Sequence, residues 1–207
     1  MKAVNNKALR LAQAALKRTD DAIQKFVSRE SLPEPLDCKP GCHFCCYNLP
    51  AITPPEALLM GHYVEQTFSD QKKEELADSI DKILKHIDGL SPYEVIMMRH
   101  ELPCIFLENG MCSVYQVRPV VCRTCTSTSA EHCKMIFESQ NHMARLRCYQ
   151  YIREIFQTVQ TDLINSCREL GYQSDLVHVA EGIRDYLKHP NPIQAWLEGE
   201  IVFYVHT

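Results

Sequence analysis

The chain has 207 residues, of which 45% are hydrophobic and 23% charged, and its formal net charge is −4. A chain of this length forms one domain of ordinary size and buries roughly 70% of its unfolded surface, so it can build a core unaided. The apolar content argues against disorder, and the seven glycines are too few for a fibrous protein. The balance of 22 basic against 26 acidic residues gives no reason to expect a nucleic-acid partner.

The first predicted element is a helix over residues 2–29, where Leu9, Ala12 and Leu16 recur at helical spacing. Its charges are mostly basic, as in an ordinary surface helix with a solvated face or in a basic docking or transit segment. It contains no continuous apolar run and no cleavage-site pattern, and no stretch of about eighteen apolar residues occurs in the sequence. We therefore expect a cytoplasmic protein with reduced thiols and no membrane partner.

Two capping boxes predict where the next helices begin. Residues 53–56 (TPPE) and 91–94 (SPYE) each place a Thr or Ser at the N-cap and a Glu three positions later. Each box also has a proline at the first helical position. Proline has no backbone N–H, and at this position an N–H would have no partner within the helix. The boxes predict helices over 54–67 and 92–99, and an apolar stripe between them predicts a third helix over 70–88.

The C-terminal third also has helical patterns. A long apolar stripe predicts a helix over 141–170, followed by a helix over 175–188 and a short one around Trp196. Cys167 continues the stripe of the long helix and Cys148 borders it, so we expect both to be core thiols rather than ligands.

These patterns predict a mostly α fold, a helical domain with a loop-rich, cysteine-containing segment between its helices. Residues 103–133 show no sustained period, and the sequence contains no repeat and no long alternating strand. We expect one structural domain with three parts: an N-terminal helix (1–29), a cysteine-cluster metal-binding region (30–140) and C-terminal helices (141–207) that pack on it.

Eleven cysteines are many for a chain without an export signal, and clustered thiols in a reducing compartment indicate metal binding or catalysis. The first cluster lies within nine residues and consists of Cys38, Cys42, Cys45 and Cys46. In a helical turn the last three of these side chains share one face. Thiolates held this closely suit a tetrahedral site for a soft metal ion.

The second cluster has wider spacings and consists of Cys104, Cys112, Cys122, Cys125 and Cys133. Such spacings do not fit half of a zinc ribbon, but they suit ligands that separate turns of a loop deliver to one ion. Arg118 and Arg123 flank the cluster and either offset the negative charge of the thiolates or serve as ordinary surface or capping arginines.

Two blocks of the sequence resemble the YkgJ-type cysteine-cluster family of zinc- or iron-chelating domains. They are CKPGCHFCC (38–46) with the following TPPEA (53–57), and PCIFLENGMCSVYQVRPVVCR (103–123). The resemblance covers roughly residues 38–135. The commonest family motif has two residues between its first two cysteines, whereas this chain has three.

The resemblance implies metal chelation by eight cysteines: Cys38, Cys42, Cys45 and Cys46 from the first block, Cys104, Cys112 and Cys122 from the second, and Cys133 as the eighth ligand. Cys125 lies outside the motif. His43 and His132 lie beside the cysteines and are the alternative ligands that the sequence offers.

The function expected from the sequence is therefore binding of zinc or iron, and an iron–sulfur cluster is one form that iron takes with such ligands. Eight thiols suffice for two four-coordinate ions, two clusters, one of each, or a multinuclear site with shared ligands. One alternative is a metal-dependent redox or group-transfer enzyme that acts on another protein. Another is a thiol–disulfide switch formed by Cys122 and Cys125.

The sequence contains no nucleophile motif, phosphate loop or dinucleotide fingerprint. The capping box explains Glu56, so no general base is assigned. The only partner that the sequence indicates is a metal ion. The sequence identifies no protein partner.

Overall fold

The structure, a computed structural model, describes residues 6–29, 32–141 and 144–204. These residues are mostly helical, as predicted. Their α-helices are α1 (Lys7–Arg29), α2 (Pro54–Thr67), α3 (Asp70–Ile87), α4 (Pro92–Met97), α5 (Val120–Thr124), α6 (Ala130–Glu138), α7 (Gln150–Glu169), α8 (Val179–Lys188) and α9 (Pro192–Leu197). Their short strands and 3₁₀ helices are β1 (Ala51–Ile52), β2 (Leu107–Glu108), β3 (Met111–Cys112), β4 (Val177–His178), η1 (Phe44–Tyr47), η2 (Arg99–Glu101) and η3 (Tyr115–Val117).

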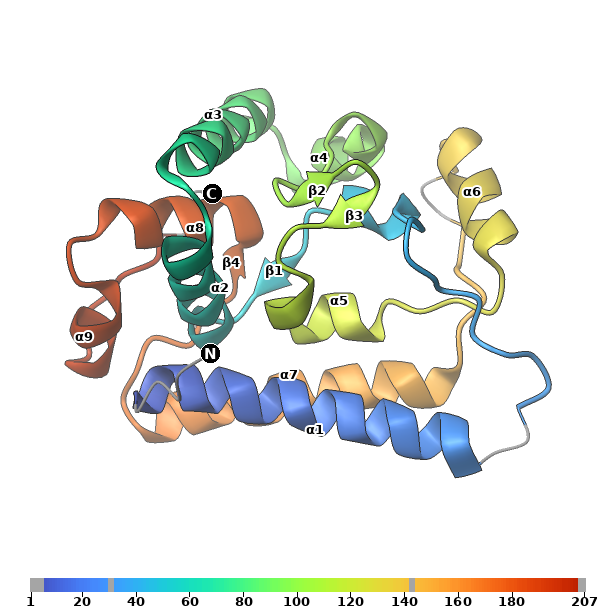
Figure 1. Cartoon of the computed structure of the whole chain (residues 1–207), viewed down its shortest axis with the longest axis horizontal. Helices are drawn as coiled ribbons and strands as arrows, with labels where there is room; N and C mark the ends of the chain where they lie inside the picture. The colour runs from blue at the N-terminus through green and yellow to red at the C-terminus, as the bar shows by residue number, and fades with distance from the viewer. Residues whose placement is uncertain (1–5, 30–31, 142–143, 205–207) are drawn as a thin grey trace.

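The two longest helices, α1 and α7, lie side by side along one edge of the molecule (Figure 1). Each buries an apolar stripe: Ala8, Leu9, Ala12, Ala15 and Leu16 on α1, and Ile152, Ile155, Val159, Leu163 and Cys167 on α7. The small side chains of α1 allow close packing, and Arg18 pairs with Asp162 across the two helices at 2.6 Å. Within the part of the chain described, no helix is both long and apolar enough to cross a membrane.

Helix α2 forms the centre of the core, packed between α1 and α8. It is buried around most of its circumference from Pro54 to Val64. Gly61 lies directly against the ring of Tyr186 on α8, where a Cβ atom would come within 2.2 Å of the ring. Only a glycine therefore allows the two helices to approach this closely.

The carboxylate of Glu56 is 2% exposed and joins two helix N-termini. It accepts hydrogen bonds from the backbone N–H and the hydroxyl of Thr53, at 2.8 and 2.7 Å, which confirms the predicted capping role. It also accepts the N–H of Val120 at 2.8 Å, at the start of α5. One buried side chain therefore fixes α2 and α5 to each other.

The strands form two small antiparallel pairs. β1 pairs with β4, and β2 pairs with β3 in a hairpin. The turn of the hairpin is Asn109-Gly110, whose φ angles of 50° and 76° are both positive. Asn-Gly is the favoured sequence for a two-residue hairpin turn, so the sequence carries a signal for this hairpin, which lies in a segment predicted as a loop.

The long C-terminal helix is shorter than predicted. α7 begins at Gln150 rather than 141, and residues 144–149 are not helical. The carbonyl of Arg147 is bonded to the N–H of Thr128, and the Tyr149 hydroxyl donates to the carbonyl of Glu34. These contacts hold the segment against distant parts of the chain.

The other boundaries differ by smaller amounts. α2 and α3 closely match their predictions, whereas the predicted helix over 92–99 ends at residue 97 and is followed by η2. The helix predicted over 175–188 begins at Val179 because residues 177–178 form β4. Helices α5 and α6 were not predicted. Residues 2–5 and 142–143 of the predicted helices lie outside the described residues.

We expect Glu56→Ala to lower the free energy of unfolding by about 2–3 kcal/mol, because it leaves buried donors at two helix ends without their charged acceptor. Glu94→Ala is the matched control, since Glu94 occupies the same place in an exposed capping box and bonds only Ser91. Its effect should be clearly smaller. Urea denaturation measures both variants, and equal losses would contradict the joining role of Glu56.

Candidate metal centre

The first cysteine block folds as a turn followed by one turn of 3₁₀ helix. Gly41 has a φ of 87°, and the N–H of Cys42 donates to the carbonyl of Lys39 at 3.0 Å. η1 then carries Cys45 and Cys46. The predicted α-helical turn would place all three thiols on one face. A 3₁₀ helix has three residues per turn. Cys42 and Cys46 share Cys45 as a neighbour, but Cys42 otherwise faces Cys133, whereas Cys46 faces Cys104 and Cys112.

The second block reaches the first from several elements. Cys112 lies on β3, Cys122 on α5 and Cys133 on α6, while Cys125 caps α5 and Cys104 precedes β2. The N–H of Cys104 donates to the carbonyl of Cys46 at 2.7 Å. This backbone bond joins the two blocks directly.

Four thiols lie near the β2–β3 hairpin, and we call them the inner group: Cys46, Cys104, Cys112 and Cys122. Each of these cysteines is close enough to another member of the group for the charge of one to shift the pKa of the other. Burial raises the pKa of Cys104 to about 12 and also raises the pKa of Cys122. Such thiols stay protonated unless a cation is near, and a bound divalent ion reverses this preference.

A second set of thiols faces a cavity of about 90 Å³, and we call it the cavity group: Cys38, Cys42, Cys125 and Cys133. Cys45 also lines this cavity. The rings of Phe44, Tyr47 and Phe137 wall it, together with Arg99 and His100. No pattern in the sequence marks these wall residues, because they are ordinary aromatic and basic residues until the fold brings them to the thiols.

Cys45 lies between the two groups. Its thiolate accepts hydrogen bonds from the thiols of Cys125 and Cys46, and with Arg118 nearby these lower the pKa of Cys45. Cys125, which lies outside the motif, is thus part of the centre. The C-x-x-C spacing from Cys122 was the signal that could have placed it there.

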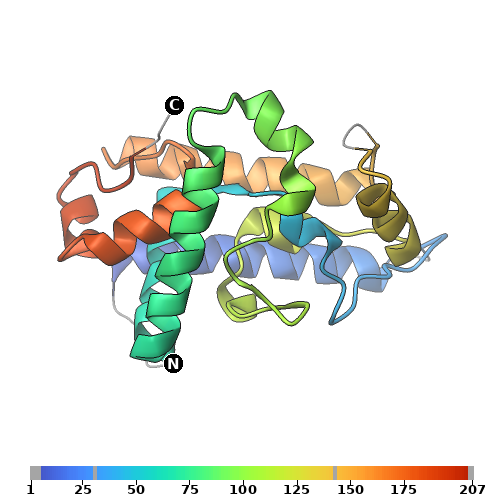
Figure 2. The same cartoon turned by 90° about the horizontal axis from the view of Figure 1, so that it is seen from above.

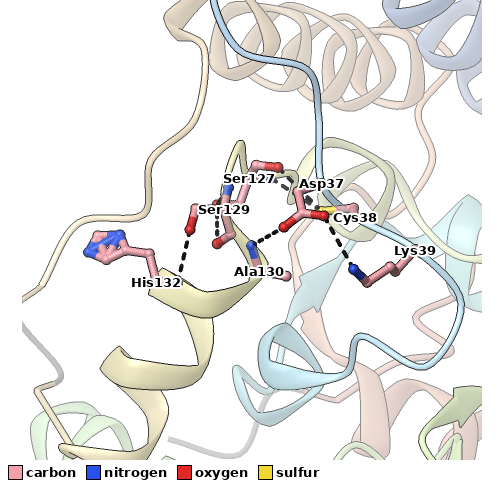
Figure 3. A network of polar contacts seen from close by, with 7 residues as sticks. All are labelled: Asp37, Cys38, Lys39, Ser127, Ser129, Ala130 and His132. Atoms are coloured by element: carbon pink, nitrogen blue, oxygen red, sulfur yellow. Dashed lines mark hydrogen bonds and ion pairs between the residues drawn. The ribbon is translucent and has the colours of Figure 1, made fainter.

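Cys38 is held at the cavity by a network between the two blocks (Figure 3). The N–H of Ser127 donates to the Cys38 sulfur at 3.2 Å, and the N–H of Asp37 donates to the Ser127 carbonyl at 2.9 Å. The Asp37 carboxylate accepts the N–H of Ala130, which lowers the pKa of Asp37, with Lys39 contributing further. Backbone donors to sulfur of this kind orient a thiolate ligand.

The two alternative histidine ligands do not join the thiols. His43 Nδ1 lies 3.0 Å from the carbonyl oxygen of Gly41, and the His43 ring packs against Phe44. The ring of His132 points away from Cys38 (Figure 3). Neither ring is among the described side chains that line the cavity.

Over residues 6–29, 32–141 and 144–204, no three Cys, His, Asp or Glu side chains stand at the mutual spacing of ligands around one ion. The donors fit zinc or iron in chemical type, because both accept shells made only of thiolates. A cysteine side chain is re-aimed by rotation about its Cα–Cβ bond between staggered positions. The eight-cysteine ligand set therefore stays a prediction, supported by the gathering of these thiols.

The two arginines of the second block have different roles. Arg118 lies over the ring of Tyr115, 4.1 Å from its centroid, and its charge acts on the thiol of Cys45. Arg123 is 8% exposed, donates to the carbonyls of Arg118 and Gln116 at 2.8 and 2.7 Å, and pairs with Asp20 of α1. Arg118 thus offsets thiolate charge, whereas Arg123 supports the loop.

The two remaining cysteines do not line the cavity. Cys167 is fully buried on α7, as predicted. The prediction that Cys148 is a core thiol is wrong, because α7 begins after it. Its half-exposed sulfur instead accepts a hydrogen bond from Arg153 Nε at 2.8 Å.

Comparison with known proteins gives one match. A family model named CxxCxxCC and described as "Putative zinc- or iron-chelating domain" matches residues 37–149, which include both cysteine blocks. No curated protein and no solved structure matches the chain.

We expect Arg123→Gln to lower the free energy of unfolding by about 2 kcal/mol, because it removes a buried guanidinium that pairs with Asp20 and leaves two carbonyls without their donor. Arg118→Gln should cost less, about 0.5–1 kcal/mol, since it removes mainly the contact with an exposed ring. Thermal and urea unfolding of both variants tests this difference. An Arg118→Gln variant as unstable as Arg123→Gln would contradict the division of roles.

Proposed function

The chain belongs to the CxxCxxCC family of zinc- or iron-chelating domains, and from this premise we propose that thiolates of both blocks are its metal ligands. The proposed set is Cys38, Cys42, Cys45, Cys46, Cys104, Cys112, Cys122 and Cys133. Cys125 joins them because its thiol bonds Cys45.

This proposal rests on one observation, that the two cysteine blocks lie close together in the structure. Cys45 contacts the thiols of Cys46 and Cys125, and the backbone of Cys104 is bonded to that of Cys46. Thiols gathered in a partly buried site repel one another when ionised, and the guanidinium of Arg118 offsets only part of this charge. A zinc or iron ion removes the repulsion by binding the thiolates.

The ligand set supports either metal. Zinc binds four thiolates in a closed tetrahedral shell, and iron binds them singly or in an iron–sulfur cluster. A thiol–disulfide switch at Cys122 and Cys125 is less well supported. Such a switch needs an exposed thiol of low pKa. Burial raises the pKa of Cys122, and a hydrogen bond with Cys45 together with burial raises that of Cys125.

The test is metal and acid-labile sulfide analysis of chain purified without oxygen, together with its visible absorption spectrum. We expect bound zinc, or bound iron, with sulfide and a brown colour where the iron forms a cluster. Cys104→Ser should lower the bound metal by about half, because one of two thiol groups loses a ligand. Cys148→Ser is the matched control, a half-exposed thiol outside the centre, and should retain the metal of the parent chain.

Metal-free protein with eleven reactive thiols would overturn the proposal. Equal losses of metal in Cys104→Ser and Cys148→Ser would remove the support for this ligand set.

A further inference from the structure

The nine clustered thiols differ in what surrounds them. The cavity is lined by Cys45 and the four thiols of the cavity group and by none of the inner group. Its volume of about 90 Å³ holds a few water molecules, because one molecule needs only about 10–15 Å³ measured this way. Solvent and small ligands therefore have room beside one set of sulfurs.

Backbone hydrogen bonds close the structure beside the inner group. Cys112 lies on β3 of the β2–β3 hairpin, Cys104 precedes β2, and Phe106 between them is 1% exposed. The Ser113 N–H bonds the Phe106 carbonyl, and the Cys104 N–H bonds the Cys46 carbonyl. These backbone bonds restrict the approach of a replacing ligand to an ion held by these sulfurs.

The cavity group has a looser frame. Cys133 lies on α6, at the edge of the molecule in both views (Figures 1 and 2). α6 packs on η1 mainly through Phe137, whose ring lies 4.6 Å from that of Tyr47 and 5.8 Å from that of Phe44. On the other side of the cavity, Cys38 is exposed. An entering ligand can therefore reach the ion from solvent.

From these differences, and resting on the proposed function, we propose that the centre has two ion sites of unequal lability. The inner group (Cys46, Cys104, Cys112 and Cys122) holds an ion permanently. The cavity group (Cys38, Cys42, Cys125 and Cys133) holds an ion that exchanges with solvent. Cys45 lies between the two sites and contacts a thiol of each.

The rate at which an ion exchanges depends on how easily another ligand reaches it. Thiolate-bound ions leave by replacement, in which a new ligand binds before an old one departs. The shell around a site controls that access. The exchangeable ion is therefore available for transfer to a partner or for binding a small ligand, while the inner ion stays bound.

The experiment is zinc release from the full chain, reconstituted with zinc under reducing conditions and mixed with an excess of a chromogenic chelator. We expect two phases of similar amplitude, with rates that differ about tenfold or more. Cys133→Ser should remove the fast phase and keep the slow one, and Cys112→Ser should do the reverse. Both cysteines are half-exposed, so they are a matched pair.

A second measurement needs no variant. Alkylation of the zinc-loaded chain, followed by mass spectrometry, should modify Cys38, Cys42 and Cys133 before Cys104 and Cys122. Release in a single phase, equal effects of the two serine variants, or earlier alkylation of the inner group would each overturn the proposal of two sites. A chain that binds no zinc or iron would instead overturn the proposed function on which it rests.

Discussion

The buried carboxylate of Glu56 links the segment that follows the first cysteine block to the helix of the second block that carries Cys122. It binds Thr53, just after the first block, and Val120, at the start of the helix that carries Cys122. A carboxylate without these donors would be costly to bury, so the two segments keep their positions together. The bond from Cys104 to the backbone of Cys46 adds a second link. Protein contacts therefore bring the two blocks face to face.

On this frame, the candidate site contains two differently placed groups of thiols. The inner group lies at a hairpin that backbone hydrogen bonds close, whereas the cavity group faces a small aromatic-walled space where α6 packs. Cys45 touches both groups. One short 3₁₀ turn thus sends neighbouring cysteines in different directions. Four cysteines within nine residues therefore serve two groups of thiols rather than one.

Much of this architecture can be predicted from local sequence patterns. The capping boxes gave the starts of α2 and α4, the apolar stripe gave α3, and the family motif named eight of the nine thiols in the centre. Tertiary contacts decided the rest. Arg147 and Tyr149 are held by distant backbone groups, so the long helix begins late. The partner of Glu56 at Val120 is 64 residues away, and no local pattern reveals it. The grouping of thiols depends on a 3₁₀ turn that cysteine spacing alone does not distinguish from an α-helical one.

X-ray absorption at the edge of the bound metal identifies the ligand atoms themselves. We expect a first shell of sulfur at about 2.3 Å, without a nitrogen contribution from His43 or His132. A first shell dominated by nitrogen or oxygen would contradict chelation by the two cysteine blocks.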